Sequence, residues 1–266
     1  MISLHNEFIK KYKKEKWIIL ITQLVILFVF IFLWEILSLT NIIDPFIFSR
    51  PSQILSLFVK YLSSNELLIH TLVSTYEVVI GLVLGTSLGL LIAIILYEFP
   101  ILAKIFDPFL IVFNALPKTA LAPILIIWVG ANIKGIVVVS ISISLVITVI
   151  NALNAFNNID SEKIKLFKTF EANKLQILRY LILPATLNDI LNIIRINIGM
   201  SWIGVIVGEF IVSKKGLGYL ITYGTQVFRL DIVMMGIVTL SVVTMLMYKI
   251  LNLIAKIIKR NNRIWN

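Results

Sequence analysis

The sequence predicts an all-α protein, a polytopic transmembrane helical bundle with about six spans. Of its 266 residues, 59% are hydrophobic and 14% are charged, and the mean hydropathy is +0.98. A soluble fold of this length needs a polar surface that this composition cannot provide. The apolar residues form continuous runs of about 20, the length that crosses the hydrocarbon core of a bilayer. A membrane β-barrel would instead show short segments of alternating hydrophobicity.

Each predicted span rests on one apolar run. The first run is too long for the hydrophobic region of a signal peptide and lacks a small-residue cleavage site, so we expect it to remain as an anchor. The third run is longer than a straight crossing needs and contains two prolines, so we expect it to be interrupted. The predicted spans cover residues 17–39, 75–97, 101–129, 134–155, 189–212 and 231–257.

Basic residues predict how the bundle is oriented. The formal net charge is +10, and lysines and arginines gather in segments 1–16, 157–187 and 258–266. An even number of spans places these three segments on one side of the membrane. Because cytoplasmic loops carry an excess of Lys and Arg, we expect this side, with both termini, to be cytoplasmic. The same rule explains the positive charge, so we expect a lipid bilayer as partner and no nucleic acid.

The external segment before the second span is expected to hold a short amphipathic helix over residues 49–57, because Arg50-Pro51 is a helix-start signal. The predicted organisation is a basic N-terminal segment (1–16), a first span with its external loop (17–74), a transmembrane core (75–257) that contains a cytoplasmic loop (157–187), and a basic tail (258–266).

Glycines recur at four-residue spacing in two of the spans. Gly81, Gly85 and Gly89 lie on one face of the second span, and Gly204 and Gly208 repeat the pattern in the fifth. A helix face without side chains lets another backbone approach closely. The spacing therefore predicts helix packing, within the chain as the favoured interpretation or across a dimer as the alternative.

Polar residues at membrane depth are candidates for lining a route through the bilayer. Asn114 and Lys118 lie in the proline-interrupted third run, where polar side chains and freed carbonyl groups cannot face lipid. They face either a watery cavity or the edge of the membrane at a kink. Arg195 is a further candidate, or else an interfacial residue. Glu209 either lines the route or is a rim carboxylate paired with a neighbouring lysine, Lys214 or Lys215.

We expect no catalytic residue, metal site or cofactor. The chain has no Cys, which excludes disulfides and thiolate ligands, and its two histidines are far apart in sequence.

The cytoplasmic loop predicts a helix, a turn and a second helix. Asp160 or Ser161 can cap the first helix, with Glu162 in its first turn. The helix should break near residues 171–173, and Pro184 should end the second one. The apolar residues of the first helix fall on one face, which either contacts a partner or packs on the protein's own loops. They are Ile164, Phe167 and Phe170.

Several segments resemble the membrane subunit of ATP-binding-cassette importers, in the branch that serves nitrate, sulfonate, taurine, bicarbonate and thiamine-precursor uptake. The segments are LWEI, RPSQIL, GLVLGTSLGLLIAI, DPFLIVFNALPKTALAPILIIWVG and GEFIVSKKGLGYLI, and they occur in family order and spacing. The resemblance covers nearly the whole chain after Leu33. One departure is Glu77, which stands where many relatives have Arg.

The cytoplasmic loop departs from the family's pattern, E-A-A-x-x-x-G-x9-I-x-L-P. Anchoring on Leu183-Pro184 puts Glu171 at the glycine position, and Lys165, Leu166 and Phe167 at E-A-A. The glycine supplies a left-handed turn, and we expect Asn173 to take it over, because Asn tolerates that conformation well. The resemblance implies contact with an ATPase at Glu162, Ile164, Lys165, Leu166, Phe167, Phe170, Glu171, Ala172, Asn173, Leu183 and Pro184.

What the resemblance implies for function is a homodimeric permease in the bacterial plasma (inner) membrane. Two ATPase subunits would each receive the helix 162–170, and an external solute-binding protein would deliver a small organic or inorganic anion or a vitamin precursor. ATP hydrolysis would reside on the partner chain, since G-x-x-x-x-G-K-[ST] does not occur in this one. The alternative is an ion- or proton-coupled secondary transporter, which usually has two related halves; we find no convincing internal repeat.

Overall fold

A computed structural model describes residues 2–261 and shows an all-helical membrane bundle in them. No strand occurs in this part of the chain. The helices are α1 (Ile2–Leu39), α2 (Pro45–Phe48), α3 (Pro51–Ser63), α4 (Glu66–Glu98), α5 (Pro100–Ala115), α6 (Lys118–Val129), α7 (Ile133–Asn157), α8 (Ser161–Thr169), α9 (Lys174–Ile177), the π-helical turn η1 (Leu178–Ile182), α10 (Leu183–Ala185), α11 (Leu187–Val212), α12 (Leu217–Gln226) and α13 (Leu230–Asn261).

The predicted number of spans is confirmed. Five helices, α1, α4, α7, α11 and α13, are long and apolar enough to cross a membrane, and α5 with α6 makes a sixth if this bent pair counts as one. The pair bends by 99° around Leu116 and Pro117, where the interrupted span was predicted. The second span is longer than predicted, because its helix already begins at Glu66.

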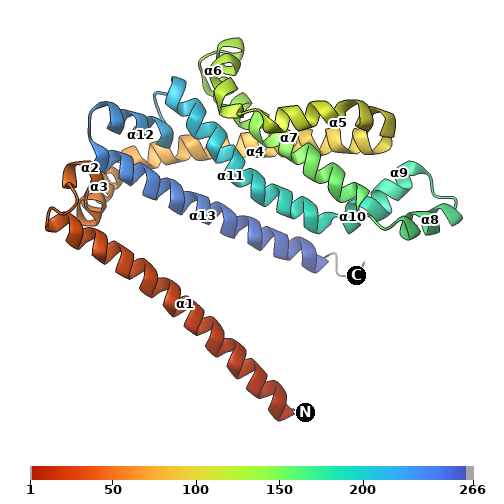
Figure 1. Cartoon of the computed structure of the whole chain (residues 1–266), viewed down its shortest axis with the longest axis horizontal. Helices are drawn as coiled ribbons and strands as arrows, with labels where there is room; N and C mark the ends of the chain where they lie inside the picture. The colour runs from red at the N-terminus through yellow and green to blue at the C-terminus, as the bar shows by residue number, and fades with distance from the viewer. Residues whose placement is uncertain (1, 262–266) are drawn as a thin grey trace.

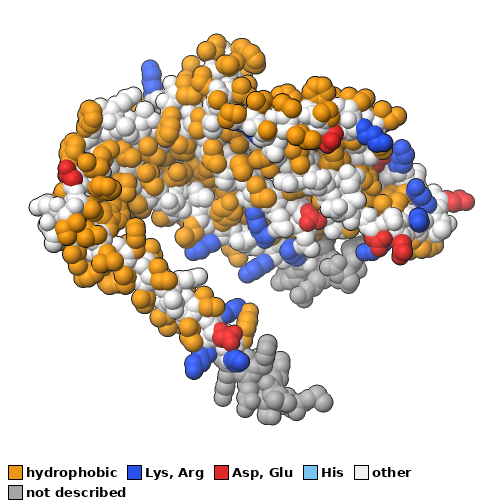
Figure 2. Space-filling model, viewed as in Figure 1, with side chains coloured by type: hydrophobic (Ala, Val, Ile, Leu, Met, Phe, Trp, Pro, Cys, Tyr) orange, Lys and Arg blue, Asp and Glu red, His pale blue; other side chains and the backbone are white. Residues whose placement is uncertain are grey.

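The long helices differ in how much of their surface they bury. Figure 1 shows α4, α7, α11 and α13 side by side, with α1 standing away from them. The apolar stretch Lys11–Leu39 of α1 has no buried residue in its most apolar window. At its end α1 is tied to α3, where the Glu35 carboxylate accepts hydrogen bonds from the Ser52 backbone N–H (3.0 Å) and hydroxyl (2.8 Å). Because its most apolar window is unburied, the apolar surface of α1, orange in Figure 2, is available to lipid or to another chain.

We call the two ends of the bundle the cap end and the loop end. The cap end holds α2, α3, α12 and the first residues of α4 and α13; the loop end holds α8, α9, η1 and α10. Charged side chains gather at the loop end and near the start of α1, whereas the middle of the visible face is hydrophobic (Figure 2). Met1 and residues 262–266, which include most of the predicted basic tail, lie outside the described residues.

The glycines of α4 and α11 pack within the chain, against α7. Each glycine of the α4 row faces a small hydroxyl side chain, with which an added Cβ would overlap. On α11, a Cβ at Gly204 would lie 2.9 Å from the backbone nitrogen of Ser140, and one at Gly208 would lie 3.0 Å from Ile136. The three helices therefore meet closely along one seam. The facing pairs on α4 and α7 are Gly81–Ser140, Gly85–Ser144 and Gly89–Thr148.

The predicted external helix exists as α3, slightly later in the chain than residues 49–57. Pro51 occupies its first turn, where a missing backbone N–H costs nothing. Its buried residues Ile54 and Leu57 join the main core, which also contains Trp202 of α11. The helix is thus amphipathic and packs against α13 at the cap end.

Candidate functional site

The loop between α7 and α11 begins with a capped helix, as predicted. Asp160 precedes α8, and its carboxylate accepts a hydrogen bond from the backbone N–H of Glu162 at 2.9 Å. This bond satisfies one of the four free N–H groups at the helix start, and Glu162 adds a negative charge in the first turn. α8 ends at Thr169, two residues before the predicted break.

The left-handed turn lies at Glu171, so the prediction that Asn173 supplies it is wrong. Glu171 has φ +56°, whereas Asn173 is extended with φ −74°. The Asn173 side chain accepts from the Gln176 N–H, and the Gln176 side chain accepts from the Asn173 N–H, both at 2.8 Å. This capping box needs an extended N-cap residue. The left-handed turn is therefore formed by Glu171, which occupies the position of the family's glycine.

The prediction that Pro184 ends the second helix is also wrong. The chain passes from α9 through η1 into α10, and Pro184 lies in the first turn of α10. Pro184 has no N–H to continue the ladder, and it follows directly on the π-helical turn, whose last bond joins the Leu183 N–H to the carbonyl of Leu178. The helical path ends at Thr186, whose hydroxyl donates to the carbonyl of Ile182 at 2.8 Å.

The predicted apolar face of α8 divides between the interior and the surface. Ile164 and Phe167 pack against a buried cluster that contains Phe156 of α7. Phe170, just past the helix end, is 76% exposed. Packing on the protein's own core therefore holds for Ile164 and Phe167, whereas contact with a partner stays a prediction for Phe170. Of the residues for which the resemblance implies contact with an ATPase, four pack inward, namely Ile164, Phe167, Ala172 and Leu183. The others are exposed, namely Glu162, Lys165, Leu166, Phe170, Glu171, Asn173 and Pro184.

Three exposed apolar side chains form what we call the coupling surface, namely Leu166, Phe170 and Leu175. Leu166 is 55% exposed, Phe170 76% and Leu175 70%. They belong to the loop end, where charged side chains gather and where lipid does not account for exposed apolar groups. Leu175 was not among the predicted contact residues, because its periodicity assigned it to the second helix alone.

The four candidates for a route through the bilayer lie in different surroundings. At the bend between α5 and α6, the Lys118 ammonium group donates to the carbonyl of Asn114 at 3.1 Å. Arg195 of α11 donates to Asn192 at 2.5 Å and to Asn252 of α13 at 3.1 Å. Glu209 is buried, with 1% of its surface exposed.

Glu209 is not a rim carboxylate paired with Lys214 or Lys215. Its Oε1 accepts from the Ser74 hydroxyl at 2.5 Å, and its Oε2 accepts from the Gly218 N–H at 2.6 Å. Among the described residues the one ion pair is between Arg229 and Asp231. Sequence reasoning missed that Ser74 lies on the face of α4 that meets Glu209; it is one helical turn before Glu77.

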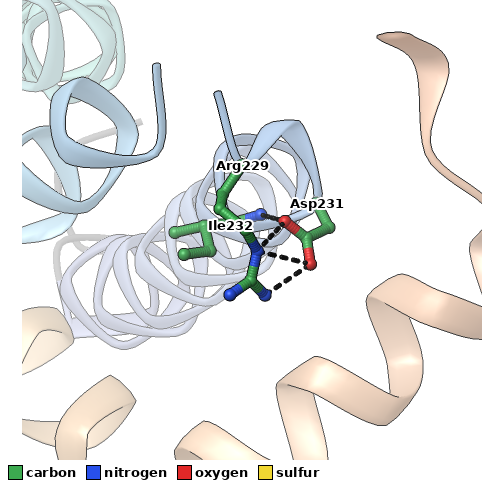
Figure 3. A network of polar contacts seen from close by, with 3 residues as sticks. All are labelled: Arg229, Asp231 and Ile232. Carbon is green, nitrogen blue, oxygen red and sulfur yellow. Dashed lines mark hydrogen bonds and ion pairs between the residues drawn. The ribbon is translucent and has the colours of Figure 1, made fainter. Parts of the chain in front are cut away.

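The ion pair stabilises the start of α13 at the cap end (Figure 3). The Arg229 guanidinium donates from Nε to Asp231 Oδ1 at 3.0 Å and from Nη2 to Oδ2 at 2.6 Å, and Oδ1 also accepts from the Ile232 N–H at 3.0 Å. The hydrogen bond to Asp231 raises the pKa of Arg229 above its ordinary value. The pair borders a cleft of about 480 Å³, which Phe46 and Lys60 also line.

No group of three or more His, Cys, Asp or Glu side chains within residues 2–261 is arranged to hold a metal ion.

Comparisons with known proteins identify the family. The model of the family described as binding-protein-dependent transport system inner membrane component matches residues 85–264. Similar proteins include the putative aliphatic sulfonates transport permease protein SsuC of Bacillus subtilis (strain 168), which is 28% identical over 216 residues that cover 81% of this chain and 78% of that protein. The formylaminopyrimidine transport permease protein ThiX of Halalkalibacterium halodurans is 29% identical over 187 residues, 70% of this chain and 74% of that protein.

A third relative is the taurine transport system permease protein TauC of Escherichia coli (strain K12), which is 23% identical over 220 residues, 80% of each chain. These relatives favour a permease over a self-sufficient secondary transporter. The family match covers more than half of the chain, so the chain belongs to the family of binding-protein-dependent transport system inner membrane components and is a permease subunit of an ATP-binding-cassette transporter.

Proposed function

We propose that the chain is one half of a homodimeric importer in the bacterial plasma (inner) membrane, driven by separate ATPase subunits that bind its loop end. The coupling surface carries this proposal, because it presents three exposed apolar side chains on a loop that is itself anchored to the bundle. An exposed apolar patch on a charged surface is typical of a docking site. Ile164 and Phe167 anchor the loop, so a push on Phe170 is transmitted to α7.

The orientation follows from this assignment. The loop end and the charged start of α1 would lie in the cytoplasm, and the cap end would face outward to receive the external solute-binding protein. The cleft beside Arg229 and Asp231 supports docking at that end, since it offers both a cation and an anion to a partner. The candidates for contact with solute are Asn114, Lys118 and Arg195, whereas Glu209 is buried and its oxygens are already hydrogen-bonded.

The solute is proposed to be a small organic or inorganic anion or a vitamin precursor. The support comes from relatives whose names refer to aliphatic sulfonates, taurine and formylaminopyrimidine. ATP hydrolysis by the complex with its ATPase and binding protein, reconstituted in vesicles and screened over such solutes, tests this. Uptake that persists without the ATPase would instead support secondary transport.

The docking proposal is tested by Phe170→Asp. The substitution places a charge on the coupling surface at a side chain that is 76% exposed, so the ATPase should no longer co-purify while thermal stability is retained. Phe228→Asp is the matched control, because Phe228 is 71% exposed but lies at the cap end, and it should leave ATPase binding intact.

Phe167→Asp completes the series. Phe167 is half-buried against the bundle, so a carboxylate there should reduce both thermal stability and ATPase binding. Undiminished co-purification of the ATPase with Phe170→Asp would contradict the proposal.

A further inference from the structure

A buried carboxyl group on α4 has no hydrogen-bond donor. Glu77 is 0% exposed, and both of its carboxylate oxygens lack a hydrogen-bond partner among the described residues. A buried charge without a partner is costly, and in a bilayer no water replaces the missing donors. The carboxyl group that lies against it is that of Glu209 on α11. Two ionised carboxylates offer four acceptors and no donor to each other.

Glu209 has the donors that Glu77 lacks. One oxygen accepts from the Ser74 hydroxyl and the other from the Gly218 N–H. Ser74 itself accepts from the Leu217 N–H at 2.7 Å, so the single hydroxyl hydrogen is free to point to Glu209. Gly218 and Leu217 are the first residues of α12, and the positive end of a helix dipole favours a negative charge. Glu209 therefore lies where an ionised carboxylate is stabilised.

The surroundings supply no cation for a second negative charge. Neither Glu77 nor Glu209 forms an ion pair in the described part of the chain. His70, which binds the same segment before α12, is already engaged, since its Nδ1 accepts from the Gly216 N–H at 2.9 Å and its ring stacks on Tyr219. Two like charges that share a buried site cannot both be ionised without a large Coulomb penalty.

We propose that Glu77 and Glu209 bind one proton between them, with Glu77 as the neutral acid that donates to the Glu209 carboxylate, and that this proton fastens α12 to α4 and α11. The proton turns two repelling acceptors into a charge-assisted hydrogen bond. It completes a hydrogen-bond network at the start of α12. In this network the backbone N–H groups of residues 216, 217 and 218 donate to His70, Ser74 and Glu209, respectively. The charge on Glu209 stays next to those N–H groups.

Infrared spectroscopy tests the proton. The full chain in lipid nanodiscs at neutral pH should show the carbonyl stretching band of a protonated carboxylic acid, and Glu77→Gln should remove it. Glu66→Gln is the matched control, because it removes an exposed carboxyl group of the same helix and should leave the band unchanged. A spectrum without the band, or a band that persists in Glu77→Gln, would overturn the proposal.

A second variant, Glu77→Asp, and the sodium dependence of thermal stability also test the shared proton. If Glu77→Gln does not accumulate, Glu77→Asp retains an acid at this position and should shift the band instead of removing it; an unshifted band would contradict the assignment. If sodium raises the thermal stability of the unaltered chain while choline at equal ionic strength does not, and the acid band is missing, the site holds a metal cation and the proton assignment fails.

The fastening of α12 is tested by cysteine labelling, since the chain has no Cys of its own. Leu220 of α12 is 3% exposed, so Leu220→Cys should react slowly with a water-soluble maleimide. Adding Glu77→Ala, which removes the donor to Glu209, should speed the reaction severalfold, whereas Glu77→Gln keeps a donor and should not. Equal rates in all three backgrounds would show that the pair does not hold α12.

Discussion

Two short helices, α12 and α8, lie at opposite ends of the same bundle and are attached to it by different chemistry. α12 begins on a buried polar network, in which its first N–H groups find Ser74 and Glu209. α8 lies on the bundle through the apolar side chains of Ile164 and Phe167, and its own start is capped locally. The hydrogen bonds of α12 are directional, whereas apolar contacts are not.

This difference indicates how each end responds to force. A displaced α12 would leave buried acceptors unsatisfied, which costs about 1–3 kcal/mol for each group. A displaced α8 would slide apolar surface over apolar surface, at a smaller cost. The cap end is therefore built to keep its shape, and the loop end to be moved by a partner.

The largest effect should come from the seam on which both ends depend. Gly204→Ala would drive a Cβ into the backbone of Ser140, so α11 and α7 must separate. Overpacking of this kind costs typically about 1–3 kcal/mol, and backbone atoms cannot rotate away, so we expect the upper end of this range. Thermal unfolding in detergent should show a clear loss of stability, and hydrogen exchange should rise in α12 and α8 together.

Gly199→Ala is the control for the seam. It lies on the same helix, but its nearest neighbour outside the helix backbone is the Tyr248 hydroxyl at 3.6 Å, an ordinary contact. Equal losses in the two variants would mean that the close approach at Gly204 is not what stabilises the bundle.

The next largest effect should be confined to the cap end. Gly216 has φ +117° and ψ 167°, a region open to glycine almost alone, and an added Cβ would overlap the Glu209 carboxylate. Gly216→Ala should therefore cost at least about 1–3 kcal/mol from backbone strain. Hydrogen exchange should increase in α12 and stay unchanged in α8. Faster exchange in both helices would show that the two ends are not independent.

A smaller effect is expected at the loop end from Asn173→Ala. The change removes the capping box at the start of α9, and loss of an N-cap side chain costs about 1 kcal/mol. Because the loop opens locally, exchange should rise around residues 170–177 while the melting temperature and α12 stay unchanged. A global loss of stability would mean that the loop is as firmly integrated as the cap.

The features that lipid imposes could be predicted from the sequence. Long apolar helices, the interruption near Pro117 and the glycine rows follow from rules of length and close packing that act within one segment. The contact of Glu77 with Glu209 could not be predicted in this way, because it depends on how α4 and α11 are rotated toward each other. The sequence did offer one signal of this contact, namely Glu77 itself, a carboxylate on the helix that carries the glycine row.

At the loop, two local rules competed for the same residue. Asn173 suits both a left-handed turn and a helix N-cap, and the sequence does not rank these options. The structure uses it as a cap, which moves the turn to Glu171. Periodicity likewise places Ile164, Phe167 and Phe170 on one face of α8. It does not say which of the three pack on the protein's own core and which are exposed.

Glu171→Gly should have the smallest effect and the opposite sign. A left-handed conformation costs a residue with a Cβ about 1–2 kcal/mol, and glycine removes this cost. Glycine also has more freedom in the unfolded chain, which returns roughly 0.5–1 kcal/mol of the gain. A net stabilisation of about 0.5 kcal/mol should remain, and it should appear as slower exchange in the loop. Glu171→Ala separates the backbone from the charge, because it removes the carboxylate and keeps the strain. If alanine slows exchange as much as glycine does, the charge of Glu171 and not its backbone is what loosens the loop end.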